Sequence, residues 1–325
     1  IIISTGSVNS TPPIPGLKEN PNCIDSTGAL SLEALPKSMV VIGGGVIGLE
    51  LACAYAAFGT KITVVEAMDH MLPMLDGDLT KIGVEHMKKM GMDFHLECPV
   101  QAVEESPVGA KVICKNKAGE TVSFEAEKVL VAIGRKANTA SLNLDAAGLK
   151  NDKGRILVND KMETSVPGVY AIGDASSVVQ LAHVAAAQGT ACVERMCGVQ
   201  DHVDLHVIPS CIYSTPEIAV VGITEAEAKE RGVPAVVGKC TMFGNARTVI
   251  EDPGRCFMKI VAHAETHEIL GASLMCQHAS DMISQISAAM VNHQTAEELR
   301  RVMRPHPSFE EAMTEALDAL ASKLA

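Results

Sequence analysis

The pattern of apolar and polar residues is clearest between residues 39 and 66. Residues 39–42 form a continuous apolar run, which is typical of a buried parallel strand. After a glycine-rich stretch, small and apolar residues at helical spacing continue through Ala56, and residues 62–65, three of them apolar and β-branched, indicate a second buried strand. This pattern predicts a strand, a tight turn, a helix and a second strand, which is the order of a βαβ unit.

The predicted turn carries Gly43, Gly45 and Gly48 in the spacing G-x-G-x-x-G. Gly43 permits a sharp reversal of the chain, Gly45 leaves bare backbone for a pyrophosphate to approach, and Gly48 allows close packing of helix on strand. The first N–H groups of the helix, including those of Val46 and Ile47, carry positive partial charge toward the phosphates. The stretch therefore predicts a dinucleotide site.

The second strand ends in a carboxylate, Glu66, 18 positions after Gly48. A carboxylate at this point accepts hydrogen bonds from both ribose hydroxyls and repels a 2′-phosphate, which favours NAD over NADP. The alternative is a glycine turn in an unrelated βαβ unit, with Glu66 a solvated strand end. We favour the dinucleotide site because strand, glycines, helix, second strand and acid all occur where such a site needs them.

The stretch that follows changes from helical to alternating spacing. Residues 72–78 are expected to form a loop with two acids, and residues 79–90 an amphipathic helix. Residues 93–133 alternate in short runs separated by turns, which predicts a small antiparallel meander that leads back into a parallel strand at residues 128–133. Gly134 ends that strand, and a glycine there lets a ligand lie over the sheet.

A second strand end occurs at residues 168–174, before a helix predicted for residues 184–196. Its last residue, Asp174, suits a polyol or ribityl hydroxyl, and it suits an N-cap equally well. From residue 203 strand-like runs precede helices, which predicts an α+β domain. We expect strands at 219–221, 256–262 and 269–274 and helices at 280–292 and 296–303.

The last predicted helix places eight apolar residues on one face. They are Phe309, Ala312, Met313, Ala316, Leu317, Leu320, Ala321 and Leu324. Two interpretations remain open for the segment that precedes them. Pro307 suits the first helical position and Glu310 and Glu311 the first turn, so the segment is a helix start; alternatively, His306 is a general base oriented by a carboxylate.

Composition narrows the class of protein. The 325 residues are 47% hydrophobic, enough for two or three domains with substantial cores. The formal net charge of −12 argues against a nucleic-acid or anionic-membrane partner. No apolar run approaches the roughly 18 residues that span a bilayer, and no secretory signal pattern occurs, so we expect no membrane span.

Ten cysteines are scattered without a regular framework, which indicates a reducing compartment and mostly buried thiols. Cys192 and Cys197 have the spacing of a redox disulfide but fall in a predicted helix. Residues five apart on a helix point in different directions, so we expect two unpaired thiols. No metal site is assigned.

The start of the chain is unusual. Residues 1–7 begin in mid-strand without an initiator methionine, so we expect the sequence to continue a longer chain. A proline-rich connector at residues 11–16 follows, too rich in proline for regular structure.

Six ordered motifs carry a family resemblance over essentially all 325 residues. They are Gly43-x-Gly45-x-x-Gly48-x-Glu50 with Glu66, Val131-Ala-Ile-Gly-Arg-Lys136, Tyr170-Ala-Ile-Gly-Asp174, Leu181-Ala-His183, Tyr213-Ser-Thr-Pro-Glu217 and His306-Pro-Ser-Phe-Glu-Glu311. In this order they resemble the flavoprotein disulfide reductases, and within that family the dihydrolipoyl (lipoamide) dehydrogenases.

The resemblance implies a Rossmann-like α/β NAD domain inserted in an FAD domain and followed by an α+β dimerisation domain. It places a remnant of the first FAD-domain segment at 1–20, the NAD domain at 21–139, the second FAD-domain segment at 140–203 and the interface domain at 204–325. It also implies a homodimer.

The resemblance carries further site residues. Glu50 corresponds to an acid near the nicotinamide pocket, and Val100 and Gly134 to further NAD contacts. Around FAD it implies seven positions: Thr5, Gly6, Asp174 and the segment Gln180, Leu181, Ala182 and His183, whose backbone lies along the isoalloxazine.

The implied reaction converts dihydrolipoamide and NAD⁺ to lipoamide and NADH through a redox disulfide and FAD. His306 would take the thiol proton and Glu311 would orient its imidazole. The implied partners are free or protein-bound lipoamide and a 2-oxoacid dehydrogenase or glycine cleavage complex, in the cytoplasm or an organelle matrix.

Two departures from the family pattern keep alternatives open. The family's first FAD glycine motif and its redox CxxxxC, both of which precede the Thr5-Gly6 turn in the family, are missing, and Cys192 and Cys197 have that spacing in a different place. Around the histidine, Arg304-Pro305 precedes His306 and Ser308 follows Pro307, where the family usually has Ala-His-Pro-Thr. The alternatives are a related reductase of glutathione, mercuric or coenzyme A disulfides, or a non-catalytic nucleotide-binding and dimerisation module. We expect these residues alone to be inactive.

Overall fold

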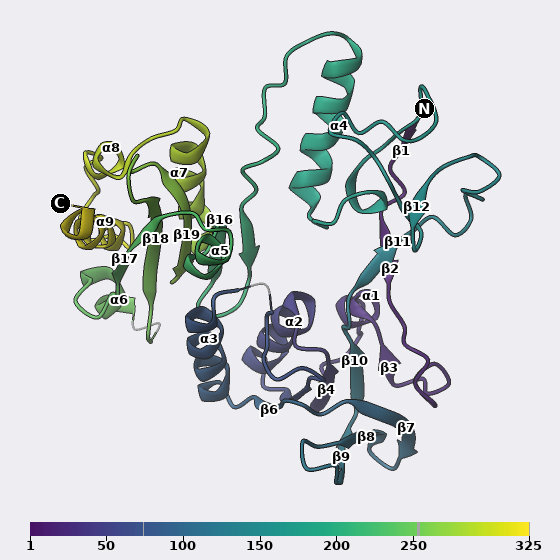
Figure 1. Cartoon of the computed structure of the whole chain (residues 1–325). Helices are drawn as coiled ribbons and strands as arrows, with labels where there is room; N and C mark the ends of the chain where they lie inside the picture. The colour runs from purple at the N-terminus through teal and green to yellow at the C-terminus, as the bar shows by residue number, and fades with distance from the viewer. Residues whose placement is uncertain (74, 252–253, 325) are drawn as a thin grey trace. The chain divides into compact units, whose positions relative to one another are not determined.

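The computed structural model describes residues 1–73, 75–251 and 254–324 (Figure 1). The chain divides into two compact units, one of residues 1–10 and 134–208 and the other of residues 11–133 and 209–325. In the part of the chain so described, no helix has both the length and the apolar character needed to cross a bilayer.

The N-terminal half of the larger unit is built on a five-stranded parallel sheet (Figure 1). Its strands lie in the order β3 (Cys23–Ile24), β10 (Lys128–Val131), β4 (Ser38–Ile42), β5 (Lys61–Val65) and β6 (Asp93–His95). Helix α2 (Val46–Ala57) joins β4 to β5. The predicted strand–turn–helix–strand unit is therefore confirmed.

Three further predictions for this half can be compared with the structure. Helix α3 (Gly77–Lys89) matches the predicted helix, but it begins early enough to include Asp78. The antiparallel meander is confirmed as β7 (Val100–Ser106), β8 (Gly109–Lys115) and β9 (Thr121–Ala126). Assigning residues 93–95 to that meander was wrong, because they form β6 and pair in parallel with β5. A short helix, α1 (Ser26–Leu30), starts at an Asp25 N-cap.

The C-terminal half of the larger unit is an antiparallel sheet with helices, as predicted for an α+β domain. The strands lie in the order β15 (Ser210–Ile212), β16 (Ile218–Gly222), β19 (Ile269–Met275), β18 (Phe257–His263) and β17 (Ala235–Cys240). The helices are α5 (Glu225–Glu230), α6 (Ala246–Glu251), α7 (Ala279–Val291), α8 (Ala296–Arg300) and α9 (Glu311–Leu324). Helix α7 packs against β16 and β19, and α9 against β17 and β18.

Helix α9 confirms the predicted apolar face, since six of the eight residues are buried and the other two half-buried. The predicted helix start at Pro307 was wrong. The helix begins at Glu311, because the Glu311 carboxylate accepts the Ser308 N–H at 3.0 Å and holds the preceding residues in a turn.

One apolar core joins the two halves of this unit. Leu79 and Ile82 of α3 belong to the same buried cluster as Ile218, Phe257 and Met275 of the antiparallel sheet. The two halves therefore pack together over a shared core rather than meeting only along a polar surface.

The smaller unit has short strands and one long helix. Strand β1 (Ile2–Ile3) pairs in parallel with β14 (Tyr170–Ala171), and β2 (Ser7–Asn9) pairs antiparallel with β11 (Arg135–Ala137). Strands β12 (Asn151–Asp152) and β13 (Arg155–Ile156) form a hairpin. A 3-10 turn, η1 (Gly173–Ala175), precedes helix α4 (Ala182–Met196).

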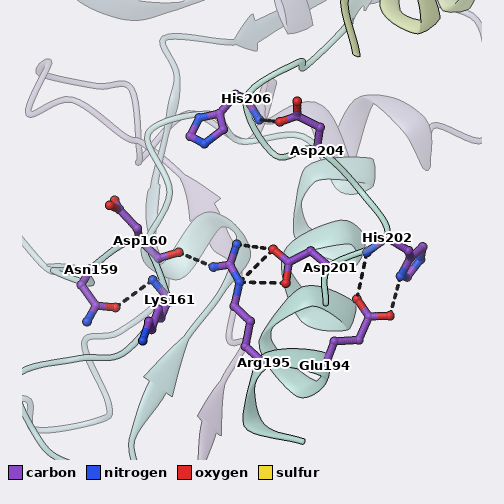
Figure 2. Close-up of polar contacts among 9 residues, drawn as sticks. All are labelled: Asn159, Asp160, Lys161, Glu194, Arg195, Asp201, His202, Asp204 and His206. Carbon is purple, nitrogen blue, oxygen red and sulfur yellow. Dashed lines mark hydrogen bonds and ion pairs between the residues drawn. The ribbon is translucent and has the colours of Figure 1, made fainter. Parts of the chain in front are cut away.

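Figure 2 shows how the end of α4 is tied to the chain around it. The Arg195 Nε lies 2.9 and 2.8 Å from the two carboxylate oxygens of Asp201, and its Nη1 donates to the Asp160 carbonyl. Beside it, His202 Nδ1 lies 2.5 Å from Glu194 Oε1. Adjacent residues of the last helical turn thus fix the segment that follows the helix.

The two cysteines at this end of α4 are free, as expected from their helical positions. Cys192 is fully buried and Cys197 is exposed.

Candidate functional site

The glycine turn lies at the carboxyl end of β4, where two of its glycines are required by close backbone approach. Gly43 has φ +109°, and a Cβ built on it would lie 2.5 Å from the Ala132 carbonyl oxygen. A Cβ on Gly48 would lie 2.5 Å from the Gly43 oxygen and 3.2 Å from Val41 Cγ1. Gly43 therefore permits the reversal, and Gly48 permits α2 to approach β4.

Gly45 is a different case. It precedes the first residue of α2 with φ −81°, and a Cβ there would have no neighbour within 4 Å. No backbone strain or packing requires glycine at this position. The position therefore offers open space beside bare backbone, next to the first N–H groups of α2. Those N–H groups have no partner within the helix, so a pyrophosphate can approach and accept hydrogen bonds from them.

Glu66 follows β5 and its carboxylate is oriented by two backbone donors. The Gly44 N–H donates to Oε2 at 2.6 Å and the Met68 N–H to Oε1 at 2.8 Å. The carboxylate is thereby held beside the glycine turn, with acceptor capacity remaining for a ribose hydroxyl. The structure brings Glu66 and the three glycines together at one edge of the sheet.

Gly44 was not among the predicted site residues. A Cβ on it would lie 2.0 Å from the Met71 sulfur, and its carbonyl accepts the Leu72 N–H at 3.0 Å. The segment after Glu66 therefore lies directly on the turn. In the sequence, Gly44 is marked only as the middle one of three consecutive glycines, and the G-x-G-x-x-G spacing does not require glycine there.

The remaining predicted NAD residues occupy neighbouring positions on the larger unit or at its boundary. Val100 begins β7, two residues after Cys98, whose N–H donates to the Glu66 carbonyl at 2.8 Å. Gly134 has φ +112° and lies between β10 and β11.

Glu50 on α2 is committed to a backbone contact. Its Oε1 accepts the Tyr213 N–H at 2.9 Å, which ties α2 to the loop between β15 and β16. Burial raises the pKa of the Glu50 carboxyl, and the Tyr213 hydrogen bond opposes this shift. No role for Tyr213 was predicted.

His306 and Glu311 form a pair at the start of α9. Nδ1 of His306 lies 2.9 Å from Glu311 Oε1, and the His306 side chain is 71% exposed. The pKa of the Glu311 carboxyl is lowered, most by the hydrogen bond from the Ser308 N–H and next by the hydrogen bond with the His306 side chain. An ionised carboxylate on Nδ1 leaves the exposed Nε2 of the imidazole as the atom that can accept a proton.

In the smaller unit, Asp174 is part of a hydrogen-bonded chain. The Ser7 hydroxyl donates to Asp174 Oδ2 at 2.5 Å, and Arg135 Nε donates to that hydroxyl at 2.7 Å. Asp174 lies inside η1, whose N-cap position is taken by Ile172, so the N-cap interpretation of this acid was wrong. Ser7 and Arg135 were not predicted as site residues, because they lie 128 positions apart in the sequence.

The other predicted FAD positions belong to two segments of the same unit. The Thr5 and Gly6 carbonyls accept hydrogen bonds from Asn138, at 3.2 and 2.8 Å. Gln180 and Leu181 are half-buried and Ala182 and His183 exposed, at the start of α4. This start is an exposed helix N-terminus beside Val178, which is 79% exposed.

Two protein-family models match the chain. The model described as pyridine nucleotide-disulphide oxidoreductase covers residues 1–189, and that of the dimerisation domain of the same oxidoreductases covers residues 208–317. The chain belongs to the pyridine nucleotide-disulphide oxidoreductase family. The expected fold, a Rossmann-like NAD domain inserted in an FAD domain and followed by a dimerisation domain, is the fold of this family.

Similar sequences in the family come from plants and bacteria. The chain is 40% identical over 326 residues to leghemoglobin reductase of Glycine max, covering 99% of this chain and 62% of that protein. It is 40% identical to the mitochondrial dihydrolipoyl dehydrogenase of Pisum sativum, covering 99% and 65%, and to dihydrolipoyl dehydrogenase 3 of Pseudomonas putida, covering 100% and 70%. The chain thus spans less than two thirds of the first two relatives.

Solved structures of the family agree. An HOCl-induced flavoprotein disulfide reductase, RclA of Escherichia coli, superposes with a TM-score of 0.87 at 29% identity, covering 99% of this chain and 72% of that one. The LpdA protein of Mycobacterium tuberculosis gives a TM-score of 0.88 at 28% identity, covering 98% and 68%.

Proposed function

We propose that the chain is part of a dihydrolipoyl dehydrogenase that oxidises dihydrolipoamide with NAD⁺. The observation that carries this proposal is the His306–Glu311 pair at 2.9 Å. It is supported by about 40% identity to two proteins named dihydrolipoyl dehydrogenase and by the carboxylate that follows β5.

The residues around the glycine turn fit NAD. The pyrophosphate would lie over Gly45 and the first turn of α2, and Glu66 would accept hydrogen bonds from the adenosine ribose. The same carboxylate would repel the 2′-phosphate of NADP. Val100, Gly134 and Glu50 are proposed as further contacts, with Glu50 nearest the nicotinamide.

The residues of the smaller unit fit FAD in part. Asp174, held by the Ser7 hydroxyl, would bind the ribityl chain beside Thr5 and Gly6, and the segment 180–183 would lie along the flavin ring. When bound, the flavin would carry electron pairs between a redox disulfide and the nicotinamide. We propose that residues beyond these 325 complete its site.

His306 would act on the thiol of dihydrolipoamide. The imidazole Nε2 accepts the thiol proton, because only the thiolate attacks a disulfide efficiently. Glu311 holds Nδ1 and stabilises the positive charge that develops on the ring. The proposed oligomer is a homodimer in which the histidine of one subunit serves the disulfide of its partner, supported by the match to a dimerisation domain.

The proposed substrate is lipoamide, either free or carried by a 2-oxoacid dehydrogenase or glycine cleavage complex. The proposed location is the cytoplasm or an organelle matrix. Ten free cysteines without a disulfide among the described residues suit a reducing compartment.

A second candidate is a related disulfide reductase with a different substrate. Arg304, two positions before His306 in the sequence, favours it. Its guanidinium hydrogen bonds to neutral groups, the Val302 carbonyl and the Thr314 hydroxyl, at 3.1 Å each, and among the described residues only the Glu310 carboxylate acts on its charge. A cation on the segment that carries the base suits a disulfide with an anionic group.

The test is turnover of the complete, flavin-loaded protein with dihydrolipoamide and NAD⁺. We expect reduction of NAD⁺, and a loss of about 100-fold or more in kcat for His306→Gln with flavin still bound. Turnover with an anionic disulfide and none with lipoamide would favour the second candidate. Undiminished turnover of His306→Gln would remove the catalytic role.

A further inference from the structure

A buried lysine lies on an inner strand of the antiparallel sheet. Lys259 is the third residue of β18, and its side chain is 5% exposed. Its Nζ lies 3.0 Å from Asp76 Oδ2, and the Asp76 side chain is 8% exposed. Buried charges of this kind persist only when they are paired, so the contact is a fixed element of the structure.

The sheet places a second lysine directly opposite the first. Lys239 of β17 is the cross-strand neighbour of Lys259 and pairs with Asp78 at 2.9 Å. Like charges directly opposite one another are destabilising by themselves. They are tolerated because Asp78 and Glu225 also lie within 4 Å of Lys259, at 3.9 and 3.8 Å.

Asp76 does not act as an ordinary helix cap. It holds the N-cap position of α3, yet its side chain makes no capping hydrogen bond and points to Lys259 instead. Asp76 directly follows Leu75, whose N–H donates to the Leu72 carbonyl at 3.0 Å. Lys259 therefore anchors, from a strand 183 positions away, the residue next to the one that holds Leu72 at the end of the segment 67–73.

The same segment lies on the nucleotide turn. Leu72 donates to the Gly44 carbonyl, and the Met71 sulfur occupies the place that a Gly44 side chain would fill. Met68 donates to the Glu66 carboxylate. Met71 and Leu72 are fully buried in the core cluster that also contains Phe257, the neighbour of Lys259 two positions earlier on β18.

We infer that Lys259 is a positioning residue of the nucleotide site. It fixes Asp76, and through the segment 67–73 it holds the turn at Gly44 and the Glu66 carboxylate in place for the adenosine half of a nicotinamide nucleotide. The inference rests on the proposed function for its ligand. On this inference the C-terminal half of the larger unit shapes the NAD site through Lys259, which acts on Asp76 and not on the nucleotide.

The test compares Lys259→Met with Lys239→Met as a matched control, because both remove one lysine of the same cross-strand pair. NADH affinity is measured by calorimetry on protein shown to be folded by circular dichroism. We expect the Kd of Lys259→Met to rise about tenfold or more, that of Lys239→Met to stay within about twofold, and Lys259→Arg to restore most of the affinity. An unchanged Kd in folded Lys259→Met would overturn the inference.

Hydrogen exchange without nucleotide gives an independent readout. Amides of residues 67–73 should exchange about tenfold faster in Lys259→Met, while those of β19 remain protected. If the substitution prevents folding, Lys259→Met/Asp76→Leu removes both buried charges and restores stability. That double variant should still bind NADH weakly, and wild-type affinity in it would overturn the inference. If the unsubstituted protein binds no NADH, the proposed function fails, and the exchange measurement alone decides the anchoring role.

Discussion

Gly45 and Gly48 belong to one sequence fingerprint but should fail in opposite ways when each is replaced by alanine. Gly45 has nothing within 4 Å of the position that an added methyl group would take, and a φ that any residue adopts. Alanine at this position is a slightly poorer N-cap than glycine, which lowers stability a little, and it reduces the conformational entropy of the unfolded chain, which raises stability a little. We expect the free energy of unfolding to change by no more than about 0.5 kcal/mol.

Gly48→Ala places its methyl group 2.5 Å from a backbone oxygen, that of Gly43, and 3.3 Å from Ala132 Cβ. The backbone cannot move aside as a flexible side chain would. Overpacking of this kind costs about 1–3 kcal/mol, against which helix propensity returns up to about 1 kcal/mol. A net loss of about 1–2 kcal/mol in the free energy of unfolding is expected.

Nucleotide binding should follow a different order. A methyl group added at Gly45 would fill the space above the bare backbone, so we expect the Kd for NADH to rise about tenfold or more, which is about 1.4 kcal/mol, in a fully stable protein. Urea unfolding and calorimetric titration on the same samples measure both quantities. A Gly45→Ala protein that binds NADH like the wild type would refute the placement of the pyrophosphate.

Three further outcomes are expected. Glu66→Ala should reduce the preference for NADH over NADPH by about tenfold, measured as a ratio of Kd values; an unchanged ratio would contradict the ribose assignment. Burial raises the pKa of three thiols from 9.0 to about 12, namely those of Cys114, Cys240 and Cys256. The stability that these buried thiols contribute is complete below pH 9 and is lost as the pH rises toward 12. Urea unfolding under reducing conditions should therefore show a free energy of unfolding that falls by about 1.4 kcal/mol per thiol for each pH unit above 9. A free energy that does not change over this pH range would be inconsistent with their burial. A double-mutant cycle of Arg195 and Asp201, measured by urea unfolding, should give a coupling energy of about 1 kcal/mol, against a few tenths for the more exposed pair of Arg155 and Asp152. Equal coupling energies would argue against a stabilising role for the Arg195–Asp201 ion pair at the end of α4.

The elements that the sequence predicted well are those in which local pattern and local structure agree. Strand β4, its glycine turn and α2 follow one another without interruption, and each short-range preference supports the next. The same is true of α9, whose apolar spacing survives in the structure even though its start was placed four residues too early. That error arose because the residues just before Glu311 form a turn in which the Ser308 N–H donates to the Glu311 carboxylate, a contact that the apolar spacing does not reveal.

Contacts between distant segments could not be predicted in the same way. Strand β6 has only three residues, so its membership of the parallel sheet depends on its neighbour β5 and not on its own pattern. Lys259 lies in an apolar run, where a lone lysine usually marks an exposed position, and its partner is distant in sequence. The chain of Ser7, Arg135 and Asp174 likewise exists only once β2 and β11 are paired.

The segment 11–133 leaves and rejoins the smaller unit through neighbouring strands. The Ser10 N–H donates to the Gly134 carbonyl at 3.0 Å, at the point where β2 and β11 end their pairing. An ancestral gene could therefore have acquired this stretch by a single insertion without breaking the host's hydrogen bonds. Its shared core with residues 209–325 sets the limit to such recombination: anyone grafting it into another scaffold would have to transfer the C-terminal sheet as well, or leave an apolar surface bare.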